Sequence, residues 1–195
     1  MNREELVKLA GEKLASSIFR DAPTEVAGLE TRAFGEMTSE DVRVFFYEDV
    51  LDELIFAATY RDEPSFALLL GAFAVDKTGP FMEVTGFSSF QQLAELDALY
   101  RELKPEMDEL IGDFNAARQP LEHVVGLFVG APGSEGKLLP EIARVHLSLF
   151  NVPYQVAAVI DPENGCLGLH ARPPSSAFFN LPFWTVRHRE DSEPE

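Results

Sequence analysis

The sequence predicts one α/β domain built on a mixed β-sheet that helices flank. Strand-like and helix-like segments alternate along the 195 residues, which is the pattern of layered sheet-and-helix folds. Several strand candidates are continuous apolar runs, as expected for strands buried on both faces. Hydrophobic residues make up 46% of the chain, which is enough for a substantial core.

The first segment, residues 2–20, has the spacing of an amphipathic helix. Its apolar stripe consists of Leu6, Ala10, Leu14 and Ile18. A stripe of this kind must be buried on the domain, on a second copy of the chain or on another protein. Residues 21–41 contain glycines and a proline, and we interpret them as a connector with one short strand.

The central part of the chain has sharper signals. Residues 42–47 are β-branched and aromatic, which favours a strand, and residues 49–60 have one apolar helical face. Residues 66–75 form a near-continuous apolar run. A turn at 76–80 and a strand at 81–85 complete a hairpin with that run.

The next elements are a helical pattern over 91–118, a buried strand at 121–129 and a glycine-rich loop at 130–136. A helix over 140–150 follows, with Pro140 in its first turn, where proline is tolerated.

A second hairpin closes the pattern. Residues 155–161 and 166–171 are strand candidates, and the turn between them contains Asn-Gly, a strong hairpin signal. The tail, residues 187–195, is charged, and we expect it to be disordered.

Three local sequences in this order resemble the MPN (JAMM-type) metalloprotease family. They are Ala-Leu-Leu-Leu-Gly at 67–71, Val-Gly-Leu-Phe-Val-Gly-Ala-Pro at 125–132 and Val-Ala-Ala-Val-Ile-Asp-Pro at 156–162. The resemblance covers about residues 42–172. It implies a cytidine-deaminase-like layered architecture, and the predicted helix over 2–20 is an extra N-terminal element outside the family-like core. We divide the chain into residues 1–41 (helix and connector), 42–186 (MPN-like domain) and 187–195 (tail).

The residues that carry the family's chemistry are missing. The resemblance places the two zinc histidines at Val129 and Ala131, the zinc aspartate at Ala143 and the catalytic glutamate at Pro64. Zinc needs nitrogen, sulfur or carboxylate donors, and it activates a bound water; these four residues have no such side chain. A one-residue slip would offer Glu63 as the glutamate, but without a metal it has no bound water to activate. The resemblance therefore implies a non-catalytic module without a metal or cofactor. It also implies that the chain pairs with a protein partner, most simply as a homodimer.

A second hypothesis rests on the loop at 130–137, Gly-Ala-Pro-Gly-Ser-Glu-Gly-Lys, which lies between a buried strand and a helix. This context is typical of phosphate-binding loops, so a nucleotide or another small ligand is the alternative partner. The glycine spacing differs from the motif, and Leu138 stands where a hydroxyl should bind magnesium. We favour a structural turn.

An aromatic segment at 177–184 follows the last family-like strand. Its side chains either fold back over the domain, which we favour, or form a hot spot of an assembly. The candidate interface residues in it are Phe178, Phe179, Phe183 and Trp184.

The charge and the cysteine count narrow the partners and the compartment. The net charge is −17, from 33 acidic and 16 basic residues; this repels nucleic acid and anionic lipid. Cys166 is the single cysteine, so no intrachain disulfide forms. There is no leader-like segment or apolar stretch of membrane-spanning length. We expect a cytoplasmic protein that binds neither membranes nor nucleic acid.

Overall fold

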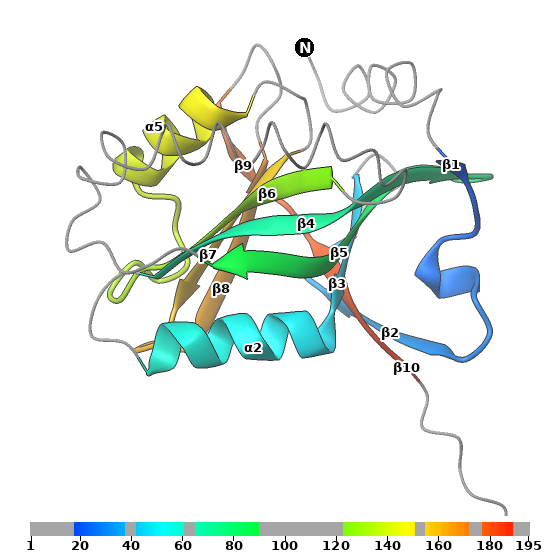
Figure 1. Cartoon of the computed structure of the whole chain (residues 1–195), viewed down its shortest axis with the longest axis horizontal. Coiled ribbons are helices and arrows are strands. Elements are labelled where there is room, and N and C mark those ends of the chain that lie inside the picture. Colours follow the sequence, from blue (N-terminus) through cyan, green and yellow to red (C-terminus); the bar gives the residue numbers. More distant parts are fainter. Residues whose placement is uncertain are drawn as a thin grey trace, which may run out of the picture.

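In the part of the chain that the structure describes, ten strands form one curled, mixed β-sheet, and two α-helices cover it (Figure 1). This is a computed structural model, and it describes residues 18–37, 42–60, 65–89, 123–150, 155–171 and 177–188. The α/β class and the mixed sheet are therefore confirmed. Neither helix in these ranges is long and apolar enough to cross a membrane.

The elements have the following bounds. The strands are β1 (Ile18–Phe19), β2 (Leu29–Phe34), β3 (Arg43–Tyr47), β4 (Ser65–Asp76), β5 (Gly79–Ser89), β6 (His123–Gly130), β7 (Val156–Asp161), β8 (Cys166–Ala171), β9 (Phe179–Asn180) and β10 (Phe183–His188). The helices are the 3-10 turn η1 (Pro23–Glu25), α2 (Glu48–Thr59) and α5 (Pro140–Leu149). Most of the expected strands and helices are confirmed, including the short strand in the connector and both hairpins. The helical pattern over 91–118 lies outside the described residues.

The expected helix over 2–20 is wrong at its end, because Ile18 and Phe19 form β1. This strand pairs in parallel with Ala74 and Val75 of β4. Strand β6 pairs with β4 only as far as Gly71, so the rest of that edge of β4 needs another hydrogen-bonding partner. The backbone N–H of Arg20 donates to the carbonyl of Val75 at 3.1 Å. Leu6, Ala10 and Leu14 lie outside the described residues.

The disordered tail was expected to begin at residue 187, but β10 continues to His188. Arg187 and His188 complete β10 and pair with Glu30 and Leu29 of β2. The Arg187 guanidinium also forms an ion pair with the Glu30 carboxylate at 2.7 Å. Pairing between strands thus outweighs the charged local composition, and the strand reaches two residues into the segment taken as a tail.

The sheet must curl because of how its last two strands are joined. The strand order is β2-β10-β3-β5-β4-β6-β7-β8-β9, which puts β9 and β10 seven places apart. At a strand spacing of about 4.8 Å, a flat sheet would separate them by roughly 34 Å. Only Leu181 and Pro182 connect them, and three Cα–Cα steps span at most about 11 Å. The two ends of the sheet are therefore brought together.

Helix α2 lies inside this curl. Its buried side chains, at Val50, Leu51, Leu54 and Ala58, pack with residues of β3 through β8 and also with Leu181 and Phe183. Residues from both ends of the sheet thus meet on one helix. Glu48 and Asp49 in the first turn of α2 favour the helix through its dipole.

The outer face of the sheet carries two smaller cores. Helix α5 packs Ile142 and Val145 against β4, β6 and β7. The other core joins Ala22 of the N-terminal segment to Phe45, Phe81 and Val186. Figure 1 shows α2 and α5 on opposite sides of the sheet, with β1 and η1 at the far end from α5.

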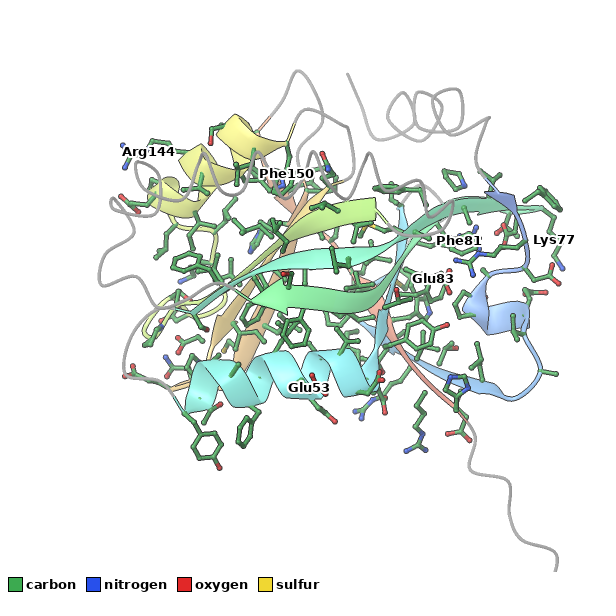
Figure 2. The ribbon with its side chains drawn as sticks, viewed as in Figure 1. Glu53, Lys77, Phe81, Glu83, Arg144 and Phe150 are labelled. Atoms are coloured by element: carbon green, nitrogen blue, oxygen red, sulfur yellow. The ribbon has the colours of Figure 1, made fainter. Side chains whose placement is uncertain are left out.

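A buried carboxylate ties the N-terminal segment to the sheet. Glu83 on β5 is only 3% exposed, and it accepts hydrogen bonds from the Arg20 guanidinium and from Tyr47 Oη. Phe81 and Glu83 both point toward that segment in Figure 2. Burial raises the pKa of Tyr47, so its hydroxyl stays a donor at neutral pH. A buried charge needs such partners, and these contacts supply them.

A second ion pair fixes the β4–β5 turn. The Arg43 guanidinium donates to both oxygens of Asp76, at 2.7 and 2.9 Å. Thr78 donates to the same carboxylate through its N–H and its hydroxyl. Burial alone would raise the pKa of Asp76, but the hydrogen bonds from Arg43 and Thr78 outweigh it and hold the pKa below its usual range. The turn is therefore anchored to β3.

The orientation of α2 predicts a large loss of stability for one substitution on this helix and almost none for another. Leu54 is 1% exposed and Phe56 is 64% exposed. Leu54→Ala is expected to lower the free energy of unfolding by about 2–5 kcal/mol, because it leaves a cavity. At protein concentrations that keep the chain monomeric, Phe56→Ala is expected to change it by no more than about 0.5 kcal/mol. Urea unfolding of both variants measures this, and equal losses would contradict the placement of the helix.

Candidate functional site

Two of the positions expected for zinc ligands lie in a packed apolar core. Val129, on β6, and Ala131, just after it, are buried in the same cluster as Ile142 and Val145 of α5. Ala143 is half-buried on that helix, and Pro64 lies outside the described residues. In the part of the chain that the structure describes, no group of three His, Cys, Asp or Glu residues could hold a metal ion.

Gly130, between these two positions, leaves no room for a side chain. A Cβ added there would overlap the Ser65 hydroxyl and lie 2.9 Å from the Ala58 methyl group. Ser65 begins β4 and Ala58 is on α2, so the strand end is wedged between a strand and a helix. Close packing of this kind, rather than turn geometry, requires the glycine.

The loop after β6 is held by Asp161 at the end of β7. Oδ2 of Asp161 accepts the N–H of Glu135 at 2.7 Å and the Asn164 side-chain amide at 2.8 Å. Oδ1 accepts the N–H of Glu163 at 3.0 Å. The hydrogen bonds, first of all that from the Asn164 side chain, lower the pKa of Asp161 to about 2. This buried carboxylate therefore joins the loop at 131–139 to the β7–β8 turn.

Several backbone N–H groups of the loop donate hydrogen bonds to acceptors in the loop itself and to Asp161. Ser134 N–H donates to Ala131 O, Gly136 N–H to Ser134 Oγ, and Lys137 N–H to Ser134 O. Phosphate-binding loops instead direct such groups at the ligand. The Lys137 ammonium is exposed and paired with Glu135. This geometry gives no support to a phosphate site at 130–137.

Ser134 is likewise a structural residue. Its side chain is buried, and its hydroxyl oxygen accepts the Gly136 N–H at 3.3 Å. A nucleophile needs an exposed hydroxyl next to a base. The loop thus resembles a compact turn closed by its own hydrogen bonds, as the sequence favoured.

Two histidines outside the loop also serve as connectors. His170 Nε2 donates to Gly136 O at 2.9 Å, and burial lowers the pKa of His170. A Cβ at Gly136 would lie 2.9 Å from Gly168 N, and a Cβ at Gly168 would overlap Gly136 O. The loop and β8 can therefore lie this close only because both positions are glycine. His146 on α5 donates through Nε2 to Gln155 O at 3.0 Å, which joins α5 to β7.

The aromatic segment at 177–184 folds back into the domain, as we favoured. Phe183 stacks on Phe34 with a centroid distance of 5.2 Å, and Trp184 stacks on Phe45 at 5.2 Å. Phe178 lies edge-on to His146 at 5.2 Å, and Phe179 pairs with Ala171 across β8. Phe183 is buried, whereas Phe178, Phe179 and Trp184 are partly exposed, so the interface expected for these three rings stays a prediction.

Two surface features were not expected from the sequence. Phe56 and Tyr60, on the outer side of α2, have adjoining rings 4.4 Å apart and are 64% and 74% exposed. A groove of about 790 Å³ opens between α2, β8 and the β9–β10 link. The exposure of Phe56 could have been predicted from the sequence, because Phe56 falls outside the apolar stripe of its helix. The groove could not have been predicted, because segments that lie far apart in the sequence line it.

The chain matches no known family model, and a search of curated proteins finds no match either.

The role of Asp161 predicts a pH dependence of stability. The pKa of Asp161 in the folded protein, about 2, lies below the value of about 3.9 that an unfolded aspartate has. The stabilisation is therefore complete above pH ~5 and is lost as the pH falls from about 4 toward 2. Asp161→Asn should flatten this part of the stability profile. Urea unfolding at pH 5 and pH 3 measures it.

Glu163→Gln is the matched control for this experiment. Its exposed side chain does not contribute to the loop, since only its backbone N–H contacts Asp161. An equal flattening in both variants would contradict the assignment of the pH dependence to Asp161.

Proposed function

We propose that this chain is a non-catalytic, MPN-like assembly module that pairs with a second copy of itself through the outer side of α2. The observation that carries the proposal is the exposed aromatic pair Phe56 and Tyr60, here called the α2 aromatic pair. The proposal joins this surface to the family resemblance, whose members without metal ligands act as architectural subunits.

The packing around β6 supports the non-catalytic part. Val129 and Ala131 fill an apolar core with α5, and Gly130 has no space for a side chain. Placing metal ligands there would require burying polar side chains in this core, which is costly without partners. The order of elements from β3 to β8 also fits the order implied by the resemblance.

The exposure of the α2 aromatic pair supports the pairing part. Aromatic side chains bury large areas in protein interfaces and are enriched there. Phe56 also lines a shallow hollow together with Phe87 of β5, so the pair adjoins a surface that a bulky side chain can enter. Within the described residues, Phe56 and Tyr60 are among the most exposed large hydrophobic side chains.

The charges beside the pair set how salt should act. Asp52 and Glu53 line the same hollow, and Glu53 projects from the outer side of α2 (Figure 2). A two-fold symmetric contact brings the same surface of both copies together. The like charges would then repel each other, and salt would screen this repulsion.

Self-association can be tested by light scattering over a range of protein concentrations. We expect a dimer whose dissociation constant falls when the salt concentration rises. Phe56→Ala should weaken the dimer at least roughly tenfold, as loss of a central aromatic residue does in other interfaces. Leu147→Ala, which removes an exposed apolar side chain from α5, should have no effect. A monomer at all concentrations, or a dimer that Phe56→Ala leaves intact, would contradict the pairing.

Metal analysis tests the non-catalytic part separately. The full chain, purified without chelators and dialysed against zinc, should retain much less than one zinc ion per molecule. The physical reason is that the expected ligand positions hold no donor atoms. Stoichiometric zinc that survives dialysis would overturn the proposal of a non-catalytic module, whatever the oligomeric state.

A further inference from the structure

The groove beside α2 lies where the two ends of the curled sheet approach each other. Its walls come from α2, from the end of β2, from β8 and from the β9–β10 link. The volume, about 790 Å³, is within the range of small-molecule sites, about 300–1,000 Å³. It differs in place and lining from the loop at 130–137.

The floor of the groove is apolar and rigid. Phe183 is buried and stacks almost parallel on Phe34, with an interplanar angle of 8°. The side chains of Leu51, Leu169 and Leu181 extend this floor. Leu181 is further held by a hydrogen bond from its N–H to Leu169 O at 2.7 Å. The surface is therefore suited to a ring or an alkyl chain.

Carboxylates line the rim on both sides. Glu48 is held in place by the hydroxyl of Thr185, which is 3% exposed and donates to Glu48 Oε1 at 2.8 Å. Asp52 lies one turn further along α2, and Glu36 comes from the opposite wall. The described lining of the groove contains no lysine, arginine or histidine; the Arg32 guanidinium lies beside it, over the Phe34 ring at 5.1 Å from the centroid. An anion is repelled by such a rim, and a cation is attracted.

We propose that this groove binds a small organic cation, an ammonium or guanidinium group carried on an apolar ring or chain. The apolar part lies on Leu51, Leu169 and Leu181 beside Phe183, because Arg32 already lies over the Phe34 ring. The cationic group lies between the carboxylates at the rim. Glu48 is already oriented by Thr185, so little ordering is needed when the cation binds. This site is additional to the proposed self-association. Asp52 borders both surfaces, so Glu48, which lines only the groove, separates the two proposals.

Three probes of nearly equal shape separate charge from size. They are 2-phenylethylamine, 2-phenylethanol and 3-phenylpropionate, titrated into the ¹⁵N-labelled full chain at pH 7 and low salt. We expect the amine to shift the backbone signals of Gly35 and Gly165 and the side-chain amide of Asn180, which all line the groove. The amine should bind roughly tenfold more tightly than the alcohol, as a charge-assisted contact implies. The carboxylate should not bind.

Variants on α2 test which carboxylates act. Glu48→Gln and Asp52→Asn should each weaken amine binding roughly threefold or more, and binding of the alcohol should not change. Asp49→Asn is the matched control, because Asp49 is exposed on the same helix but outside the groove. Unchanged binding of the alcohol shows that the variants are folded.

Several results would overturn the proposal. These are equal affinities for the amine and the alcohol, shifts located away from the groove, or an equal effect of Asp49→Asn. A capped peptide with one lysine between apolar residues serves as the last probe. It should bind more weakly than the amine, since tighter binding would assign the groove to a protein segment instead of a small molecule.

Discussion

The two-residue link between β9 and β10 is the constraint on which the other features depend. Leu181 and Pro182 join strands that lie seven places apart in the sheet order, so the sheet must curl until its ends approach each other. The curl encloses the apolar side of α2. It leaves the groove where the two ends approach. The aromatic residues next to the link, Phe183 above all, are needed inside the molecule to fill this closure.

The sequence predicted the elements whose local signals agree with their packing. Strands β4, β6 and β7 are long apolar runs, and Asn164-Gly165 marks the β7–β8 turn. The two-residue strands β1 and β9 could not be predicted, because an unpaired edge of a neighbouring strand decides them. Strand β10 was not predicted either: residues 183 and 184 were placed in the aromatic segment and residues 187 and 188 in the tail, because its partners β2 and β3 lie far away along the chain. Local composition contains no information on which edge is free.

The candidate sites differ in how much of them could be predicted from the sequence. The glycine-rich loop at 130–137 was interpreted as a structural turn, and its N–H groups donate within the loop and to Asp161. The part played by Asp161 was not expected, because its hydrogen-bond partners come from the loop and from the next turn. The groove depends on residues between positions 34 and 185, which only the curl brings together. Hydrophobic periodicity predicts the buried face of a single helix or strand. It cannot predict a groove that several elements line together.

The place of β10 also has a consequence for how the chain reaches this fold. Strand β10 lies between β2 and β3, and its Arg187 pairs with Glu30, 157 positions earlier. During synthesis, β2 and β3 are made long before the strand that separates them. Their facing edges therefore have no native partner until residues 183–188 have been translated, and pairing across such distances is slow. Exposed edges of this kind favour aggregation, so the incomplete chain is most prone to aggregate during that interval.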